Sequence, residues 1–582
     1  MLSFRYSSPS SCAAPILCFV LLLLPVFSQA QLSKGSQIIL NRGLQLQGLS
    51  QDDCYLHLDT FSNANYTAIH WINSVSPAHS SRPEWMGNPP GFPWARWVGD
   101  ETQLPPQSAT PFDGSETPYL GQLLALQLGD EWNLNDDATR TRLVNWFNSV
   151  RSNWPNVMLF HNNWGSQIGD SQLADFYTRA HPDMLCFDTY PWQSVYDTGQ
   201  PNNTGPPIPG PPTGWYGDLR RYREHARGAG VPLAAYRQTF HAVQDYDQHV
   251  FRDPSPSELR LNTFSALAFN AKMLIDFVYN TGAASLFTKT FNGSGDTQIS
   301  SNGLYAEMAD SNKRAGNLGK ALSGLTVITT EGHAGYTTSI MIIRGKDANG
   351  VLTPIPVGFL ADQDTPSANY TDWVYQRNDL WLNGWVITNK AGIKNNGYPG
   401  DIIIAWFKPM HENLDGTNYN GQVYYMVVNG LTDPTGTAAD CMQEIKLNFA
   451  NSPPSTAILL DPNTGLLQTN NMADIGSGKR QLILNLNGGD AALFKLNTGA
   501  PFVGFINPGP ARLSAQKQGT NIAIGVQATP GARYLLQSSA SLTNPSWTTL
   551  TNTVLVSSSF VFQQSLGLSN SARYYRAVGV PP

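Results

Sequence analysis

Charge is scarce in this chain of 582 residues. Asp, Glu, Lys and Arg make up 13% of it, about half the share found in ordinary globular domains. The formal net charge is −6 and there is no run of basic residues, so nucleic acid is not expected as a partner. Aromatic residues are plentiful instead, with 15 Trp and 23 Tyr. A weakly charged, aromatic-rich surface suits neutral polar ligands.

Cysteine is scarce too. Of the five cysteines, Cys12 and Cys18 lie in an N-terminal apolar segment, which leaves Cys54, Cys186 and Cys441. An odd number at wide spacing gives no disulfide framework, and none of the spacings is that of a zinc site. The motifs GxSxG and HExxH are absent as well. We therefore expect neither a metal nor a cofactor.

Only one long apolar run occurs, at Ile16–Phe27. It follows Arg5 and precedes SQA at 28–30, a small-x-small cleavage site. The run is too short for a comfortable membrane span, and an uncleaved anchor is the alternative. We expect residues 1–30 to be a signal peptide, with no membrane span after its cleavage. The protein would then be secreted, periplasmic or on the cell surface.

Residues 37–320 show repeated strand–helix units. Apolar runs of strand length alternate with helical patterns, such as those at 138–154, 216–230 and 255–271. Eight strands with intervening helices predict an α/β fold, a (β/α)8 barrel of the TIM type. An open doubly wound sheet is the alternative, but no glycine-rich phosphate loop supports it. The candidate strands are 44–49, 67–72, 94–98, 123–129, 157–162, 184–188, 231–238 and 272–279.

The pattern changes after the barrel. Alternating apolar runs with turn residues between them predict an antiparallel β-sandwich at 322–500. A Pro/Gly linker at 501–512 and a small C-terminal β-module at 513–582 follow. Two long insertions in the barrel, 76–93 and 193–214, come after strands, so they are expected to wall a cleft on the catalytic face.

Two strings in the barrel end in carboxylates and aromatics. LALQLGDEWN (124–133) contains Asp130 and Glu131, and DMLCFDTYPW (183–192) contains Asp188. In parallel sheets and barrels the C-terminal strand ends share one face, where active sites lie. Glycoside hydrolysis needs two carboxyl groups at such a place, with a flat apolar surface for sugar rings.

These three carboxylates are the catalytic candidates. Glu131 is expected to be the general acid, because a carboxyl group beside another carboxyl and a Trp should have a raised pKa. Asp188 would be the nucleophile, the general base or an orienting group, and Asp130 would orient the substrate. A helix cap, an ion pair or a loop-holding hydrogen bond are the structural alternatives. The string GDE also occurs at 99–101, after a weaker strand, which makes Asp100 and Glu101 rival candidates.

Other strand ends carry side chains suited to a neutral sugar. Neutral His, Asn and Gln bind hydroxyl groups, and Trp and Tyr stack on sugar rings. Core packing and turn formation are the alternatives for these residue types. Arg237 and His241 follow the seventh strand, and Asp276 in the eighth is expected to be a structural group inside the barrel. The candidate sugar-binding residues are Trp71, His161, Asn163, Tyr190, Trp192, Gln238 and Tyr279.

The order of five strings resembles bacterial secreted glycoside-hydrolase-like barrels. The strings are GDEW, FHNNW, PDMLCFDTYPW, AAYRQTF and KMLIDFVYNTG. The family pattern has strands ending in Asp-Glu-Pro, in Asn and in Asp-x-Tyr-Pro, and Trp132 here replaces the usual Pro. The resemblance covers roughly residues 120–285 and implies a barrel, a following β-sandwich, and an oligo- or polysaccharide substrate. The tail, with YLLQSS and RYYRAV, resembles C-terminal modules of secreted proteins from Verrucomicrobia-like bacteria.

One departure from the family pattern leaves the nucleophile unassigned. Clan A retaining enzymes place a nucleophilic Glu after strand seven, where this chain has Arg237 and Gln238. Carboxylates after strands four and six are similar to the α-galactosidase-like arrangement. An adjacent Asp-Glu pair is similar to hexosaminidases that use the substrate's own acetamido group. We expect a secreted glycoside hydrolase, with retention favoured; a non-catalytic carbohydrate-binding protein and a structural cell-surface protein are the alternatives.

Overall fold

The computed structural model describes most of the chain. The helices and strands that the structure describes lie within the compact unit Ser33–Pro582. The signal peptide predicted at 1–30 lies outside the described residues. Within the part that the structure describes, no helix is long and apolar enough to cross a membrane. The described residues are 32–50, 58–71, 92–99, 117–193, 213–240, 251–280, 286–291, 297–301, 303–328, 340–361, 364–366, 381–415, 423–565 and 573–582.

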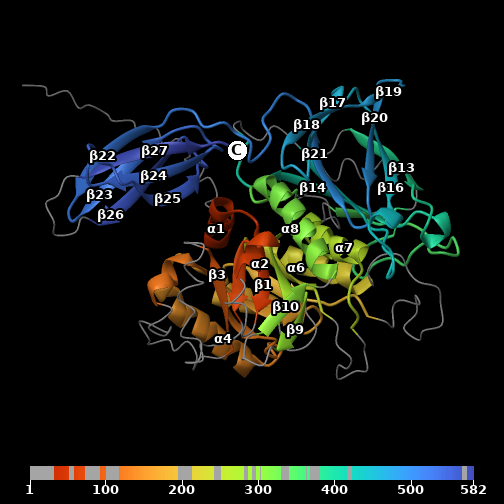
Figure 1. Ribbon diagram of the computed structural model, residues 1–582, viewed down its shortest axis with the longest axis horizontal. Helices are drawn as coiled ribbons and strands as arrows, with labels where there is room; N and C mark the ends of the chain where they lie inside the picture. The colour runs from red at the N-terminus through yellow and green to blue at the C-terminus, as the bar shows by residue number, and fades with distance from the viewer. Residues whose placement is uncertain are drawn as a thin grey trace, which may run out of the picture. The chain divides into compact units, whose positions relative to one another are not determined.

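Eight parallel strands close into a barrel (Figure 1). Each strand pairs with the next one in the chain, and β8 closes the ring on β1. The strands form at apolar runs because both faces of a barrel strand are covered, one by the interior and one by the outer helices. The predicted (β/α)8 barrel is confirmed, and the open sheet is wrong. The strands are β1 (Gln45–Ser50), β2 (Ala68–Trp71), β3 (Trp94–Val98), β4 (Leu123–Asp130), β5 (Met158–Trp164), β6 (Leu185–Asp188), β7 (Leu233–Gln238) and β8 (Ala271–Asn280).

The three predicted helices are present as α4, α6 and α7. α7 begins with a capping box, in which Ser255 and Glu258 each accept a hydrogen bond from the other's backbone N–H. Such a cap stabilises a helix by about 1 kcal/mol. The helix ends at Ala268, earlier than predicted, because Asn270 turns the chain into β8 with a φ of 76°. The helices are α1 (Lys34–Arg42), α2 (Leu58–Asn63), α4 (Asp137–Val150), α5 (Asp170–Ala180), α6 (Thr213–Ala229), α7 (Pro256–Ala268) and α8 (Gly303–Leu322), with 3-10 turns at Thr117–Gln122, Arg151–Asn153, Asn395–Gly397 and Ala439–Cys441.

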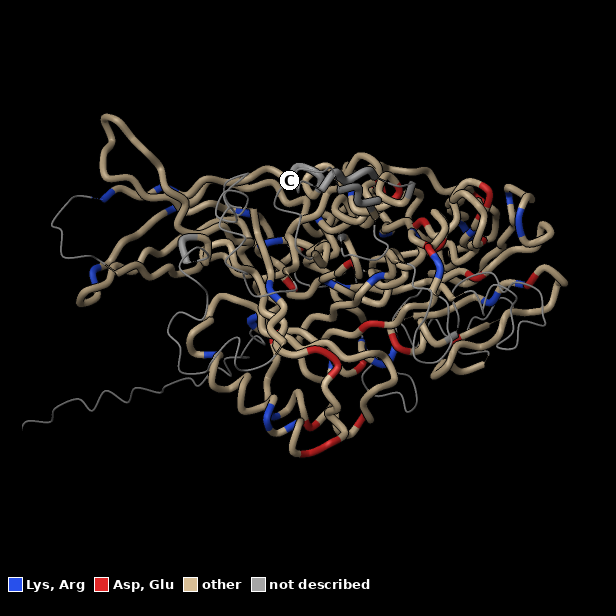
Figure 2. Tube along the Cα trace, turned by 60° about the horizontal axis from the view of Figure 1, so that its bottom comes forward, with Lys and Arg blue, Asp and Glu red and all other residues tan. Residues whose placement is uncertain are grey.

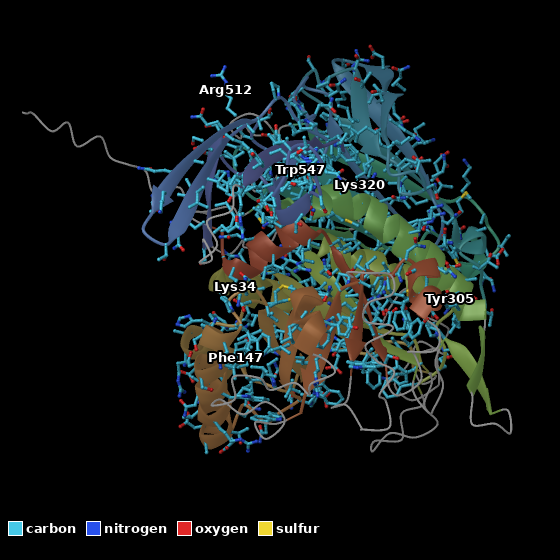
Figure 3. All side chains as sticks on the ribbon, turned by 60° about the vertical axis from the view of Figure 1, so that its left-hand side comes forward. Lys34, Phe147, Tyr305, Lys320, Arg512 and Trp547 are labelled. Atoms are coloured by element: carbon cyan, nitrogen blue, oxygen red, sulfur yellow. The ribbon has the colours of Figure 1, made fainter. Side chains whose placement is uncertain are left out.

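The buried face of α4 is the one that its apolar spacing predicts. Leu143, Phe147 and Val150 recur every three or four residues and are all buried. Phe147, labelled in Figure 3, packs edge-on against Phe176 of α5, with the ring centres 5.6 Å apart. This contact holds α4 and α5 together behind β4 and β5.

Two antiparallel sheets follow the barrel, as predicted for the sandwich. One has the strand order β11-β14-β15-β21-β17-β18, with β12 also on β14, and the other has the order β13-β16-β20-β19. Apolar side chains of both sheets form one core. A hairpin of β9 and β10, which was not predicted, precedes α8. The strands are β9 (Phe287–Phe291), β10 (Thr297–Ser301), β11 (Leu325–Val327), β12 (Ile340–Ile343), β13 (Leu382–Asn389), β14 (Ile402–Pro409), β15 (Tyr424–Asn429), β16 (Gln443–Phe449), β17 (Thr456–Leu460), β18 (Leu467–Asn471), β19 (Ala473–Gly476), β20 (Lys479–Leu486) and β21 (Ala491–Leu496).

The C-terminal module has two three-stranded antiparallel sheets, β22-β23-β26 and β25-β24-β27. The segment 501–512 before it carries buried side chains. Phe502 packs edge-on against Tyr424 of the sandwich, with ring centres 4.9 Å apart, whereas Ile506 belongs to the core of the module. The division between the two domains thus falls between Phe502 and Ile506. The strands are β22 (Arg512–Gln518), β23 (Asn521–Gln527), β24 (Arg533–Ser539), β25 (Thr548–Val554), β26 (Ser559–Ser565) and β27 (Tyr574–Val580).

A buried ion cluster ties the barrel to the sandwich. Arg260 of α7 pairs with Glu307 of α8 and, at 3.1 Å, with Asp490 of the β20–β21 turn. Gly489 beside Asp490 lies so close to α7 that a Cβ atom would stand 2.3 Å from the Ser257 carbonyl oxygen. Acidic and basic residues are interspersed along the chain (Figure 2), so the fold rather than a charged run assembles this cluster.

Candidate active site

Three carboxyl groups meet at the C-terminal mouth of the barrel. Asp130 ends β4, Glu131 follows it, and Asp188 ends β6, so strands separated only by β5 bring them to one place. The Asp188 carboxyl group hydrogen-bonds to the Glu131 carboxyl group, and it lies close enough to Asp130 for that charge to act on it. The structure thus brings together the three catalytic candidates of the sequence.

A β-bulge at the end of β4 sets the direction of these side chains. Gln127 pairs with Phe160 and Asp130 with Asn162, so β4 has one more residue than β5 between the two pairs. Gly129 permits the bulge, because its φ of 71° suits a residue without a side chain. Strict alternation would place Gln127 and Asp130 on opposite faces of the strand. The bulge places them on the same face.

Asp130 is held by hydrogen bonds inside the barrel. Its Oδ1 accepts from Gln127 Nε2 at 2.9 Å and from Asn162 Nδ2 at 3.0 Å, and the Tyr236 hydroxyl donates to Gln127 Oε1 at 2.6 Å. Burial, assisted by the charge of Glu131, outweighs these bonds and raises the pKa of Asp130 from 3.8 to about 7. The sequence analysis missed Gln127 and Tyr236, because both read as ordinary residues of buried strands.

The surroundings of Asp188 favour its protonated form. Burial is the largest cause, and the charges of Glu131 and Asp130 and the hydrogen bond with Glu131 add to it, so the pKa of Asp188 lies well above 3.8. Ionising Asp188 beside another acid is costly, so Asp188 holds its proton more tightly than an ordinary Asp. The pKa values raised at this site are those of Asp188 and Asp130, whereas the sequence analysis expected a raised pKa on Glu131.

Tyr190 lies against Asp188 on an aromatic wall. Its ring centre is 5.0 Å from that of Phe240 and 5.5 Å from that of Phe277. Burial raises the pKa of Tyr190 well above 10, and the charge of nearby Asp188 adds to this, so the hydroxyl keeps its proton. Tyr190 therefore belongs to the site, and its stacking on a sugar stays a prediction.

Glu131 is exposed in the mouth of the barrel, and its backbone is left-handed, with a φ of 49°. Its N–H donates to the Asn162 carbonyl at 2.9 Å, and its own carbonyl accepts from Gln167 Nε2. A left-handed backbone costs a non-glycine residue about 1–2 kcal/mol. The bonds from both neighbouring segments hold Glu131 in this conformation.

Trp164 is a residue that the sequence analysis passed over. The predicted strand ended at 162, whereas β5 continues to Trp164, which pairs with Asp188 in register. Side chains alternate along a strand, so Trp164 starts on the same face as Asn162. Its side chain is 47% exposed. A strand prediction two residues longer would have placed it at the site.

His161 and Asn163 alternate with Asn162 and start on the opposite face of β5. The His161 ring packs against Trp132 and Phe176, with ring centres 6.3 and 6.0 Å away, and its Nδ1 meets a backbone carbonyl of β4 at 2.7 Å. Burial lowers the pKa of His161 to about 4, so the ring is neutral. The structure does not bring His161 to the carboxylates, and Asn163 is buried as well.

The side chain of Gln238 forms hydrogen bonds with the backbone of Trp192. Gln238 Oε1 accepts from the Trp192 N–H at 2.8 Å, and Gln238 Nε2 donates to the carbonyls of Trp192 and Arg252, both at 2.9 Å. Trp192 and Trp71 are each only 2% exposed. A sugar would reach these rings only after a neighbour moved, so their stacking roles stay predictions.

Tyr279 and Asp276 lie in a buried network. Tyr279 stacks on Phe61 with ring centres 3.7 Å apart. Asp276 accepts from Arg237 Nε at 2.6 Å and from the Tyr66 hydroxyl, and Arg237 also donates to side chains of α7 and α8. Asp276 is thus a structural group as expected, but it faces the outer helices, and its predicted place inside the barrel is wrong.

The described cysteines form no disulfide, and several predicted residues lie outside the described part of the chain. Cys186 and Cys441 are buried free thiols. Among the described residues, no group of three or more His, Cys, Asp or Glu side chains could hold a metal ion. The predicted features outside the described residues are Asp100, Glu101, His241, Cys54 and most of the insertions at 76–93 and 193–214.

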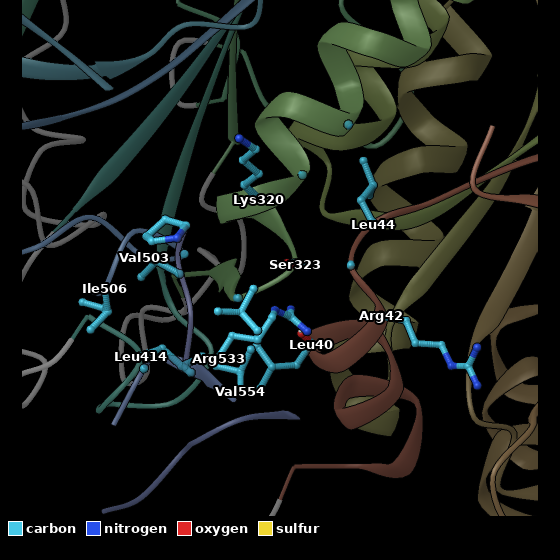
Figure 4. Close-up of a pocket in the computed structure, with 18 of the residues that line it drawn as sticks. Leu40, Arg42, Leu44, Lys320, Ser323, Leu414, Val503, Ile506, Arg533 and Val554 are labelled. Atoms are coloured by element: carbon cyan, nitrogen blue, oxygen red, sulfur yellow. The ribbon is translucent and has the colours of Figure 1, made fainter. Parts of the chain in front are cut away.

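A cavity of about 370 Å³ lies at the other end of the barrel, beside the C-terminal ends of α1 and α8 (Figure 4). Arg42, Lys320 and Arg533 are among the residues that line it. Arg533 donates to the carbonyls of Leu40 and Asn41 at 3.1 and 2.6 Å. Cations are expected beside helix C-termini, so the charge of this cavity has a structural cause.

Comparison with known proteins places the chain in no family. No family model matches it, and no curated protein sequence does. Similar solved structures include QR15, an aldolase, with a TM-score of 0.25 and 9% identity over 41% of this chain and 90% of that one. Gas2p of Saccharomyces cerevisiae, solved with laminaritetraose and laminaripentaose, has a TM-score of 0.32 and 9% identity over 47% of this chain and 64% of that one.

A mandelate racemase/muconate lactonizing enzyme from a marine actinobacterium has a TM-score of 0.25 and 10% identity over 41% of this chain and 54% of that one. The chain therefore spans less than two thirds of this protein and of the yeast one. The named activities differ from one another, and similarity at these TM-scores carries no argument about function. The function is argued from the site.

Proposed function

We propose that the protein is a secreted glycoside hydrolase whose catalytic pair is Glu131 and Asp188. The observation that carries this proposal is the contact between their carboxyl groups at the C-terminal mouth of a closed parallel barrel. Active sites of such barrels lie at this face. Two carboxyl groups there are the minimum that most glycosidases use.

Two other buried acids of the chain are paired with arginines. Asp276 pairs with Arg237 at 2.6 Å, and Asp490 pairs with Arg260 at 3.1 Å. Within the described part of the chain, no Lys or Arg pairs with Asp188, which faces other acids instead. Buried carboxylates without a cation cost stability, and perturbed pairs of this kind gather at functional sites. A purely structural role therefore explains the pair poorly.

One proton on the pair is enough for the reaction, once it has moved from Asp188 to the neighbouring carboxyl group of Glu131. Exposed Glu131 donates it to the glycosidic oxygen as the bond from that oxygen to the anomeric carbon breaks. Ionised Asp188 attacks the same carbon and forms an ester. A water molecule then gives its proton to Glu131 and its oxygen to the anomeric carbon, and Asp188 leaves as a carboxylate. The pair regains its one proton.

Retention of the anomeric configuration is part of the proposal. Retaining enzymes hold their carboxyl groups about 5–5.5 Å apart, and inverting enzymes leave about 6.5–9.5 Å for a water molecule. Groups in hydrogen-bond contact are nearer to the retaining distance, and the exposed Glu131 side chain can turn aside when a sugar enters. Asp130 beside the pair would orient a sugar substituent, an N-acetyl group being the one that the adjacent Asp-Glu arrangement suits.

Turnover of a substrate panel tests the function. The panel contains aryl glycosides, including N-acetyl forms, and plant and algal polysaccharides. Glu131→Gln and Asp188→Asn should each lower turnover of substrates with poor leaving groups by about 10²–10⁴-fold. Asp401→Asn is the matched control, since burial raises the pKa of this sandwich carboxyl to about 6; its turnover should equal that of the wild type.

Each alternative has its own result. Binding of a glycan without turnover would indicate the non-catalytic carbohydrate-binding protein. Full activity of Asp188→Asn would refute the pairing and direct attention to Asp130. Proton NMR of the first-formed anomer decides the stereochemistry, and an inverted product would refute retention. Secretion is tested separately by sequencing the mature N-terminus, which should begin at Gln31.

A further inference from the structure

Among the described residues, four tryptophans lie at or just after the C-terminal ends of barrel strands, and their rings are not equally accessible. Trp71 and Trp192 are each 2% exposed. Trp132 stacks on Trp146, and the guanidinium of Arg142 lies 4.2 Å from its ring centre. Trp164 differs, because 47% of its side chain is exposed to solvent.

Trp164 is held in place by the chain segments that carry the two members of the proposed catalytic pair. It pairs with Asp188 in register across β5 and β6. Its N–H donates to Gln167 Oε1 at 3.2 Å, and Gln167 Nε2 donates to the Glu131 carbonyl. One side chain thus links the backbone of Trp164 to the backbone of Glu131.

A ligand that covers the exposed ring of Trp164 would gain free energy from the contact. A Trp side chain offers about 150–250 Å² of contact area, and burying apolar surface is favourable by about 25 cal/mol per Å². The C–H face of a sugar ring is flat and apolar, so it suits this surface. A Trp at the mouth of the barrel, near two acids, is therefore suitably placed to stack on a sugar ring.

We propose that Trp164 is the stacking platform for the sugar unit on the leaving-group side of the scissile bond. This rests on the proposed function. The leaving-group side follows from the link through Gln167, because Glu131 is the group that gives its proton to the departing oxygen. The substrate class is therefore an oligo- or polysaccharide, in which a sugar and not a small aglycone leaves.

The test compares two substrates that share one glycone. The first is an oligosaccharide that the wild type cleaves, and the second is the glycosyl fluoride, whose leaving group has no ring to stack. Trp164→Ala should lower kcat/KM on the oligosaccharide by about 10–100-fold and leave kcat/KM on the fluoride unchanged. Trp164→Phe should recover most of the loss on the oligosaccharide.

Tyr574→Ala is the control, because Tyr574 is an aromatic of the C-terminal module that is 36% exposed. It should change neither substrate's kinetics. Equal values for Trp164→Ala and the wild type on the oligosaccharide would overturn the platform alone. An equal loss on both substrates would overturn the leaving-group side. A wild type that cleaves nothing in the panel would overturn the proposed function, and the platform with it.

Discussion

Replacing Asp130 by Asn should stabilise the protein, and more so at higher pH. Asp130 is half-buried among polar groups and has a pKa of about 7 in place of 3.8. Asn has the same shape, and its Oδ1 can accept the same hydrogen bonds from Gln127 and Asn162. The substitution therefore removes a carboxyl group that burial keeps from ionising and leaves its contacts in place.

The magnitude follows from proton linkage. The folded state holds the Asp130 proton more tightly than the unfolded state, so wild-type stability falls as the pH rises from about 4 to about 7. A shift of about three pH units corresponds to roughly 4 kcal/mol. Asn does not titrate, so the variant should exceed the wild type by less than about 1 kcal/mol at pH 4 and by about 4 kcal/mol at pH 8.

Thermal unfolding at the two pH values measures this difference. For a large domain, about 4 kcal/mol corresponds to a rise in Tm of roughly 8 °C. The control is Asp136→Asn, since Asp136 is an exposed helix cap whose pKa is lowered by the Thr139 N–H, and it should give no gain at pH 8. A gain for Asp130→Asn that is absent at pH 8, or equal at both pH values, would refute the reasoning.

Three further outcomes are expected. Gly129→Ala should cost about 1–2 kcal/mol in thermal unfolding, because its φ is 71°, and it should lower turnover; Gly519→Ala, at φ 60° with open space around it, should leave turnover intact. Arg237→Met leaves Asp276 buried without its cation and should destabilise the protein by about 3–5 kcal/mol in urea. Truncation after Phe505 should leave turnover of soluble substrates unchanged; an unfolded or inactive product would mean that the C-terminal module supports the barrel.

The strands and their order could be predicted because each barrel strand is an apolar run of strand length with polar residues after it. β4 and β6 show this most clearly, and their terminal acids followed from the same pattern. The bulge at Gly129 could not be predicted, because a glycine in a strand can mark a bulge, a tight bend or the close approach of another backbone. The bulge decides that Asp130, and not its neighbour, shares a face with Gln127.

The exposure of aromatic side chains could not be predicted from the sequence either. Trp164 and Trp192 each follow the same kind of strand and stand near Asn, Tyr or Pro. Their difference comes from the chain segments that pack on them, such as the backbone bonds that Gln238 makes around Trp192. Those segments are distant in sequence, so residue type and spacing carry no information on which ring stays open.

The contrast between Asp188 and Asp276 shows what only the tertiary structure could supply. Both are acids within apolar barrel strands, in LCFD and LIDF. Asp276 lies in register with Arg237 of the neighbouring strand, and this cation acts against the burial that raises its pKa. Asp188 meets Glu131 and Asp130 instead, so every charge that acts on it adds to the effect of burial. Burial and these charges all favour the protonated form of Asp188, and the proposed mechanism passes that proton to Glu131 for donation to the departing oxygen.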